Sequence, residues 1–143
     1  MAQYAGLRVL GLDVGERRIG MAISDPTCTI SSPLSPIVRS NEHEDIKNII
    51  NVANDNQVKT IVVGLPISLS GTLGPQGRKI KLFIKELSIS SNIPVRSQDE
   101  RFSTVEAQKL LREGGHKPSH NKGLLDSASA AIILQSYLDR TVP

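Results

Sequence analysis

At 143 residues and 15.5 kDa, the chain has the length of one ordinary domain, and we expect a single domain over residues 1–143. Its hydrophobic fraction of 38% includes no Trp, which predicts an aliphatic core, and its single cysteine excludes an intramolecular disulfide. The formal charge of +3 gives only a slight preference for a polyanionic partner, and no apolar run approaches the roughly 20 residues that span a bilayer.

The first elements are predicted to be strands. Residues 7–13 form a largely apolar run that ends in Asp13, which is typical of a buried central strand. Gly15 permits a tight turn, and alternating apolar residues over 18–24 predict a second strand, antiparallel to the first. A third strand over 31–39 is expected at an edge of the sheet, because its two prolines cannot donate to a ladder.

Helices and strands then alternate. Apolar periodicity and turn residues predict, in order, a helix over 41–56, a strand over 60–64, a helix that begins at Pro75, a strand over 94–100, a helix opened by the capping box of Ser103 and Glu106, and a last helix over 124–138. The polar, basic segment over 115–123 is expected to be a mobile loop. This order predicts an α/β domain that opens with an antiparallel pair of strands.

Three acidic residues lie where a regular element meets a loop, namely Asp13, Glu100 and Asp126. Carboxylates from separate elements can chelate Mg²⁺, which prefers hard oxygen ligands. For Asp13 an ion pair with Arg17 or Arg18 is an equally good interpretation. For Asp126, position alone favours a structural role, because an acidic residue at a helix start usually caps the helix or offsets its dipole.

Two further features suggest contacts with phosphate, each with an ordinary alternative. The Gly- and Ser-rich loop over 64–76 offers backbone N–H groups to an anion, but it lacks the Gly-Lys-Ser/Thr ending of a nucleotide-binding loop and is otherwise a simple connection. Several basic residues could follow a nucleic-acid backbone, although a solvated helix face has the same sequence pattern: Arg78, Lys79, Lys81, Arg101, Lys109 and Arg112.

Four segments, taken together and in this order, resemble the YqgF family, a bacterial and plastid family similar to Holliday-junction resolvases. They are residues 13–25 (DVGERRIGMAISD), 63–76 (VGLPISLSGTLGPQ), 99–107 (DERFSTVEA) and 126–138 (DSASAAIILQSYL). The resemblance spans nearly the whole chain. It implies a ribonuclease H-like fold, α/β in class, in which a mixed five-stranded sheet has helices on both faces.

The resemblance also implies a site. The acidic positions of the family fall on Asp13, on the Asp99–Arg101 segment and on Asp126, which implies an Mg²⁺ or Mn²⁺ site made by Asp13, Glu100 and Asp126. Glu100 is preferred to Asp99 because alternate residues of a strand face opposite sides and Glu has the longer reach, but the pair stays open. The residues expected to bind the substrate backbone are Arg17, Arg18, Arg101, Arg78 and Lys79.

The implied activity is metal-dependent phosphodiester hydrolysis, by a cytoplasmic nuclease that processes the 5′ end of pre-16S ribosomal RNA. Resolution of branched DNA is the alternative substrate assignment. A non-catalytic nucleic-acid-binding module is the alternative of a different class, since the fourth acidic ligand that resolvases carry is not evident here. No membrane partner is expected, and the protein is expected to be a monomer or a homodimer.

Overall fold

The computed structural model of the protein describes residues 6–68, 70–100 and 122–141, and of residues 122–126 and 141 only the backbone. Its elements are β1 (Arg8–Val14), β2 (Arg18–Ser24), β3 (Ser31–Val38), α1 (Glu42–Asp55), β4 (Val58–Leu65), α2 (Pro75–Ser90), β5 (Val95–Asp99) and α4 (Lys122–Thr141). The predicted elements within these ranges are confirmed in type and order. The predicted helix at Ser103 and the predicted mobile loop over 115–123 lie outside the described residues. None of the described helices is both long and apolar enough to cross a membrane.

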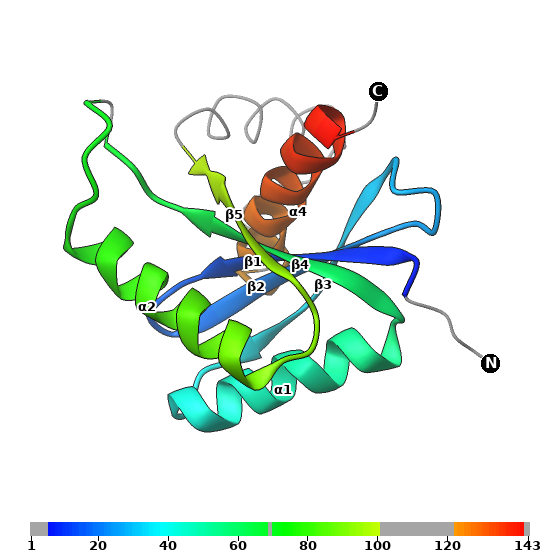
Figure 1. Ribbon diagram of the computed structural model, residues 1–143, viewed down its shortest axis with the longest axis horizontal. Coiled ribbons are helices and arrows are strands. Elements are labelled where there is room, and N and C mark those ends of the chain that lie inside the picture. Colours follow the sequence, from blue (N-terminus) through cyan, green and yellow to red (C-terminus); the bar gives the residue numbers. More distant parts are fainter. Residues whose placement is uncertain (1–5, 69, 101–121, 142–143) are drawn as a thin grey trace.

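The strands form one mixed sheet of five strands in the order β3-β2-β1-β4-β5 (Figure 1). β2 pairs with β1 and with β3 in antiparallel fashion, whereas β4 pairs with β1 and with β5 in parallel. The edge position predicted for β3 is therefore confirmed. Because β1, β4 and β5 are parallel, their carboxyl ends meet at the same edge of the sheet, which brings together segments that are far apart in the sequence.

Helices cover both faces of the sheet, as predicted: α1 and α2 lie on one face and α4 on the other (Figure 1). The larger core lies under α1 and α2, and it includes Leu10, Leu12 and Val14 of β1. The smaller core lies under α4 and consists of Val9, Ala22, Val62, Ala130, Ile133, Leu134 and Leu138. Alternate residues of β1 thus belong to opposite faces, which fixes the side on which Asp13 emerges.

Helix α4 packs closely on the sheet and is tied to β3. A Cβ atom at Gly11 would lie only 2.7 Å from Leu134 Cβ, so the alanine-rich helix reaches the backbone of β1. Its Ser127 hydroxyl donates to the Leu34 carbonyl of β3, and its Gln135 side chain accepts from the Ser31 N–H at 3.0 Å. These contacts fix the orientation of α4 on the sheet.

The start of α4 corrects one expectation. The helix begins at Lys122 and has no acidic residue in its first turn, whereas Asp126 was predicted to lie there. Gly123 was assigned to the preceding loop, yet glycine inside a helix costs only about 1 kcal/mol, which tertiary packing can offset. Asp126 therefore lies beyond the first turn, where a role as a cap or a dipole partner does not explain it.

Candidate metal centre

Asp13 lies at the carboxyl end of the central strand, on the face that α4 covers. In β1, Val9 belongs to the core under α4, and Gly11 contacts α4 directly. Asp13 follows at the same two-residue period, while Leu12 and Val14 pack into the opposite core. Its register partner on β2 is Gly20, which has no side chain to fill the space beside the carboxylate.

Glu100, which directly follows β5, reaches the same place. A Cβ atom at Gly64 would lie 3.0 Å from both Cδ and Oε1 of Glu100, and 2.5 Å from Cδ1 of Ile133 in α4. The Glu100 carboxyl group therefore lies over Gly64, on the α4 face of the sheet. Asp99 is the register partner of Leu65, which packs against the core on the other face. The two acids thus leave the strand on opposite sides.

The electrostatics of Glu100 show that carboxyl groups gather at this edge. Burial raises the pKa of Glu100, and the negative charges of Asp13 and Asp99 raise it further, from 4.5 to about 7. Carboxylates held together in this way repel one another, and a bound cation would remove the repulsion. Hard carboxylate oxygens on separate elements are also the donors that Mg²⁺ and Mn²⁺ prefer, so the residues present fit such an ion.

The third proposed ligand, Asp126, is placed only by the backbone of α4, and Arg101 lies outside the described residues. Among the side chains that the structure describes, no three acidic, His or Cys residues are arranged to hold a metal ion. Asp126 directly precedes Ser127, which is anchored to Leu34 of β3. The structure thus brings Asp13 and Glu100 together, with Asp99 near them, and the contribution of Asp126 stays a prediction.

The predicted substrate-binding residues that the structure describes lie on both faces of the sheet. Arg17 is exposed in the turn between β1 and β2, and Arg18 is two residues before Gly20, on the same face as Asp13. Arg78 is exposed on α2, where its Nη1 donates to the Leu73 carbonyl at 3.1 Å. Lys79 lines a cavity on the face opposite to α4. Strand alternation and helix packing therefore separate Lys79 from the carboxyl groups.

The loop between β4 and α2 is held by its own hydroxyl groups. The side chains of Ser68, Ser70 and Thr72 lie within hydrogen-bond distance of one another, at 2.7 to 3.1 Å. The Ser68 N–H also donates to the Thr72 carbonyl at 3.0 Å. The predicted helix start at Pro75 is confirmed, and Gly74 before it supplies no side-chain cap. The internal bonds favour the interpretation of this segment as a structural connection.

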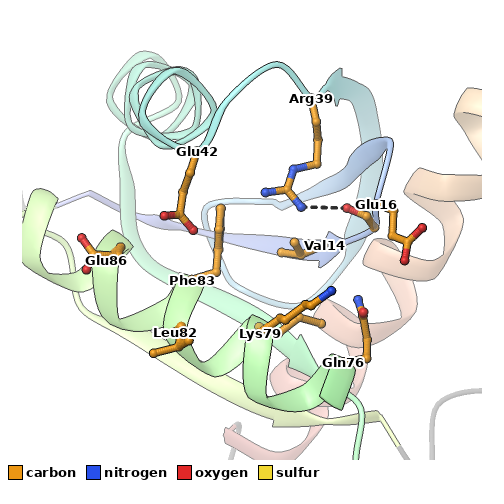
Figure 2. Close-up of a pocket in the computed structure, with 11 residues that line it drawn as sticks. Val14, Glu16, Arg39, Glu42, Gln76, Lys79, Leu82, Phe83 and Glu86 are labelled. Atoms are coloured by element: carbon orange, nitrogen blue, oxygen red, sulfur yellow. Dashed lines mark hydrogen bonds between the residues drawn. The ribbon is translucent and has the colours of Figure 1, made fainter. Parts of the chain in front are cut away.

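Arg39 joins three elements on the face opposite to the carboxyl groups, a feature that sequence analysis missed. It lines a cavity of about 550 Å³ together with Val14, Gly15, Glu16, Glu42, Gln76, Lys79, Ile80, Leu82, Phe83 and Glu86 (Figure 2). Its Nη1 donates to the Gly15 carbonyl at 3.0 Å, its Nε donates to Asp45 at 3.1 Å, and its guanidinium lies 5.5 Å from the centre of the Phe83 ring. The turn that follows Asp13 is thereby tied to α1 and α2.

A signal for the buried ion pair was present in the sequence. Asp45 lies four residues before Ile49 and next to Ile46, on the stripe of α1 that faces the sheet. A carboxylate on a buried stripe requires a partner, and Arg39 is the closest arginine along the chain. The pairing could have been proposed from that pattern.

Solved structures of two resolvases share this fold. RuvC of T. thermophilus in complex with a Holliday junction substrate matches with a TM-score of 0.61 at 13% identity, covering 94% of this chain and 95% of that chain. The fowlpox virus resolvase in complex with Holliday junction DNA matches with a TM-score of 0.61 at 14% identity, covering 95% and 99%. The mixed sheet with helices on both faces thus defines a protein with the ribonuclease H-like fold of these resolvases.

Sequence comparison assigns the family. The model of the RuvX family, described as Holliday junction resolvase, matches residues 7–140. A relative from Thermoanaerobacter pseudethanolicus is 43% identical over 134 residues, 93% of this chain and 96% of its own length. One from Roseiflexus sp. is 42% identical over 132 residues, 92% and 94% of the two chains. Both are named "Putative pre-16S rRNA nuclease". The chain belongs to the RuvX family, which is the YqgF family under another name, and this confirms the resemblance seen in its four motifs.

Proposed function

We propose that this protein is a cytoplasmic, divalent-metal-dependent nuclease that hydrolyses phosphodiester bonds and processes the 5′ end of pre-16S ribosomal RNA. The observation that carries the proposal is the Glu100 carboxyl group, which lies partly buried over Gly64 with its pKa raised to about 7 beside two other carboxylates. A protein gains no stability from burying a carboxyl group beside like charges, and groups with a pKa perturbed in this way cluster at functional sites. The names of relatives above 40% identity support the ribosomal RNA substrate.

In this proposal Asp13, Glu100 and Asp126 hold Mg²⁺ or Mn²⁺. When bound, the ion supplies an activated water molecule for hydrolysis and charge neutralisation at the phosphate. The protein's own contribution is to position the three acidic residues. The rigid strand β1 fixes Asp13, the space over Gly64 admits the Glu100 carboxyl group, and α4, anchored through Ser127, carries Asp126.

Basic residues bind the nucleic-acid backbone in this proposal. Arg17 and Arg18 lie in and beside the turn that follows Asp13, and in this proposal they contact phosphates next to the reacting one. Arg101 follows Glu100 directly in the sequence and is assigned the same role. Arg78 and Lys79 on α2 would contact the backbone farther from the carboxyl groups, with Lys79 on the opposite face.

Resolution of Holliday junctions is the second candidate function. The description of the family model favours it, and the two solved resolvases that share the fold are in complex with Holliday junction substrate or DNA. A homodimer would explain cleavage of two strands of a junction, whereas processing of one RNA end needs only one active site. Substrate preference therefore separates the two candidates.

The test is cleavage of an end-labelled pre-16S ribosomal RNA fragment and of a four-way DNA junction by wild-type protein with Mn²⁺, Mg²⁺ or EDTA. We expect cleavage of the RNA that needs the metal and is lost in Asp13→Asn. Asp55→Asn, the same substitution at an exposed acid at the end of α1, serves as the matched control and should cleave normally. Binding of the RNA or the junction without cleavage products, with either metal ion, would overturn the nuclease assignment and favour a non-catalytic module.

A further inference from the structure

Gln98 of β5 has a buried side-chain amide whose donor lacks a partner. Its side chain is only 5% exposed, and its Nε2 atom makes no hydrogen bond with any residue that the structure describes. A buried N–H group without an acceptor costs free energy, so native proteins keep few of them. Such a donor needs an explanation in terms of packing or of function.

The register of the sheet places this amide beside the candidate metal centre. Gln98 is the partner of Gly64, and residues in register on neighbouring strands leave the sheet on the same face. Gly64 contacts Ile133 of α4, so this face is the one that α4 covers. Because Gly64 has no side chain, the space over it is left to other groups, and the Glu100 carboxyl group lies there. Gln98 is also two residues before Glu100 along the chain.

We propose that Gln98 is a positioning residue, which donates a hydrogen bond from Nε2 to the Glu100 carboxylate when the metal ion is bound. This inference rests on the proposed function. Carboxylates that ligate a metal are themselves held by hydrogen bonds, because a fixed orientation maintains both affinity and geometry. Gln98 is a buried donor on the same face of the sheet as the Glu100 carboxyl group, two residues before Glu100, and its Nε2 has no acceptor among the described residues.

The test compares two substitutions that each remove one unsatisfied buried polar group. Gln98→Met keeps the length of the side chain but has no donor. The matched control is Ser31→Ala, because Ser31 Oγ is also buried without a partner among the described residues, yet Ser31 pairs with Ser24 at the opposite end of β2 from the carboxyl groups. Binding of Mn²⁺ alone is measured by electron paramagnetic resonance, with thermal melting in EDTA alongside.

We expect Gln98→Met to raise the Kd for Mn²⁺ about tenfold, a typical effect of losing the partner of a metal ligand. Its melting temperature in EDTA should not fall, and Ser31→Ala should bind Mn²⁺ as the wild type does. Equal affinity in wild type and Gln98→Met would overturn this inference while leaving the metal site intact. Absence of Mn²⁺ binding by the wild type would instead overturn the proposed function, and this inference with it.

A measurement on the wild-type protein keeps the inference testable if Gln98→Met does not fold. The side-chain amide of Gln98 gives its own ¹H–¹⁵N signals in nuclear magnetic resonance spectra. We expect these signals to shift when Mg²⁺ is added to the wild type and to stay in place in Asp13→Asn. Unchanged signals of the wild type at saturating Mg²⁺ would show that the Gln98 amide does not donate to the Glu100 carboxylate.

Discussion

Two acidic residues on opposite faces of the sheet show how neighbours decide the role of a buried charge. Asp45 of α1 is only 1% exposed, yet it accepts from Arg39 Nε at 3.1 Å and from the Ser40 N–H at 3.0 Å. Glu100 is less deeply buried, and its burial together with the negative charges of Asp13 and Asp99 raises its pKa to about 7. A positive charge thus lies beside Asp45, whereas negative charges act on Glu100.

The difference teaches which of the two is structural. The partners of Asp45 come from the chain itself and join the start of α1 to the turn after Asp13 through Arg39, so the charge is satisfied on folding. The negative charges of Asp13 and Asp99 beside Glu100 raise its pKa, and a cation from solution would weaken this repulsion. Burial alone does not separate the two cases, whereas the sign of the surrounding charge does.

The largest expected effect follows from Asp13→Asn. Loss of a ligand charge should lower the rate of RNA cleavage by more than about 1,000-fold, which corresponds to about 4 kcal/mol of transition-state stabilisation. The melting temperature in EDTA should stay the same or rise, because one repelling charge has gone. Single-turnover cleavage with Mn²⁺ measures the rate, and a loss of less than about tenfold would exclude Asp13 as a ligand.

Asp45→Asn should give the opposite pattern. Removal of this charge leaves the Arg39 guanidinium partly buried without its counter-ion, and we expect the free energy of unfolding to fall by about 3 kcal/mol. Urea denaturation measures the change, and Mn²⁺ affinity of the folded protein should be retained. If Asp45→Asn is as stable as the wild type, the assignment of Asp45 as a structural charge is wrong.

Gly64→Ala tests how closely Ile133 and the Glu100 carboxyl group pack over Gly64 of β4. The new methyl group would meet Ile133 Cδ1 at 2.5 Å and the Glu100 carboxyl group at 3.0 Å, so we expect a loss of about 2 kcal/mol in stability and weaker Mn²⁺ binding. The control is Gly74→Ala, because a Cβ atom at Gly74 has no neighbour within 4 Å and should cost less than about 1 kcal/mol. Similar effects from both substitutions would show that contacts with Ile133 and Glu100 do not cause the loss at Gly64.

The smallest effect is the pH dependence of the metal-free protein. Since the pKa of Glu100 is about 7 in the folded state and 4.5 ordinarily, the folded state keeps a proton that the unfolded chain loses between these values. Its contribution to stability therefore falls as pH rises from 4.5 to 7. In EDTA at pH 8, Glu100→Gln should be more stable than the wild type by on the order of 1 kcal/mol, after allowance for solvent screening. An equal difference at pH 4 and pH 8 would contradict this origin.

Local sequence patterns predicted most of the fold because the forces that set its elements act at short range. The alternation in β2, the prolines of β3 and the helix start at Pro75 each depend on residues close in the chain, and each prediction is confirmed. The start of α4 was placed too late, because its first turn contains Gly123, and glycine has a low intrinsic helix propensity that locally favours a helix boundary.

In the candidate site, too, some features follow from local sequence and others only from the tertiary structure. The sequence by itself determined that Asp13 ends a buried strand and that Asp99 and Glu100 leave a strand on opposite faces, since both follow from the two-residue period of a strand. Only the tertiary structure decided that Glu100 lies over Gly64, that Gln98 shares that face, and that Arg39 neutralises Asp45. These contacts join strands and helices that are distant in sequence, and their energies depend on register, burial and neighbouring charge, which exist only once the chain has folded.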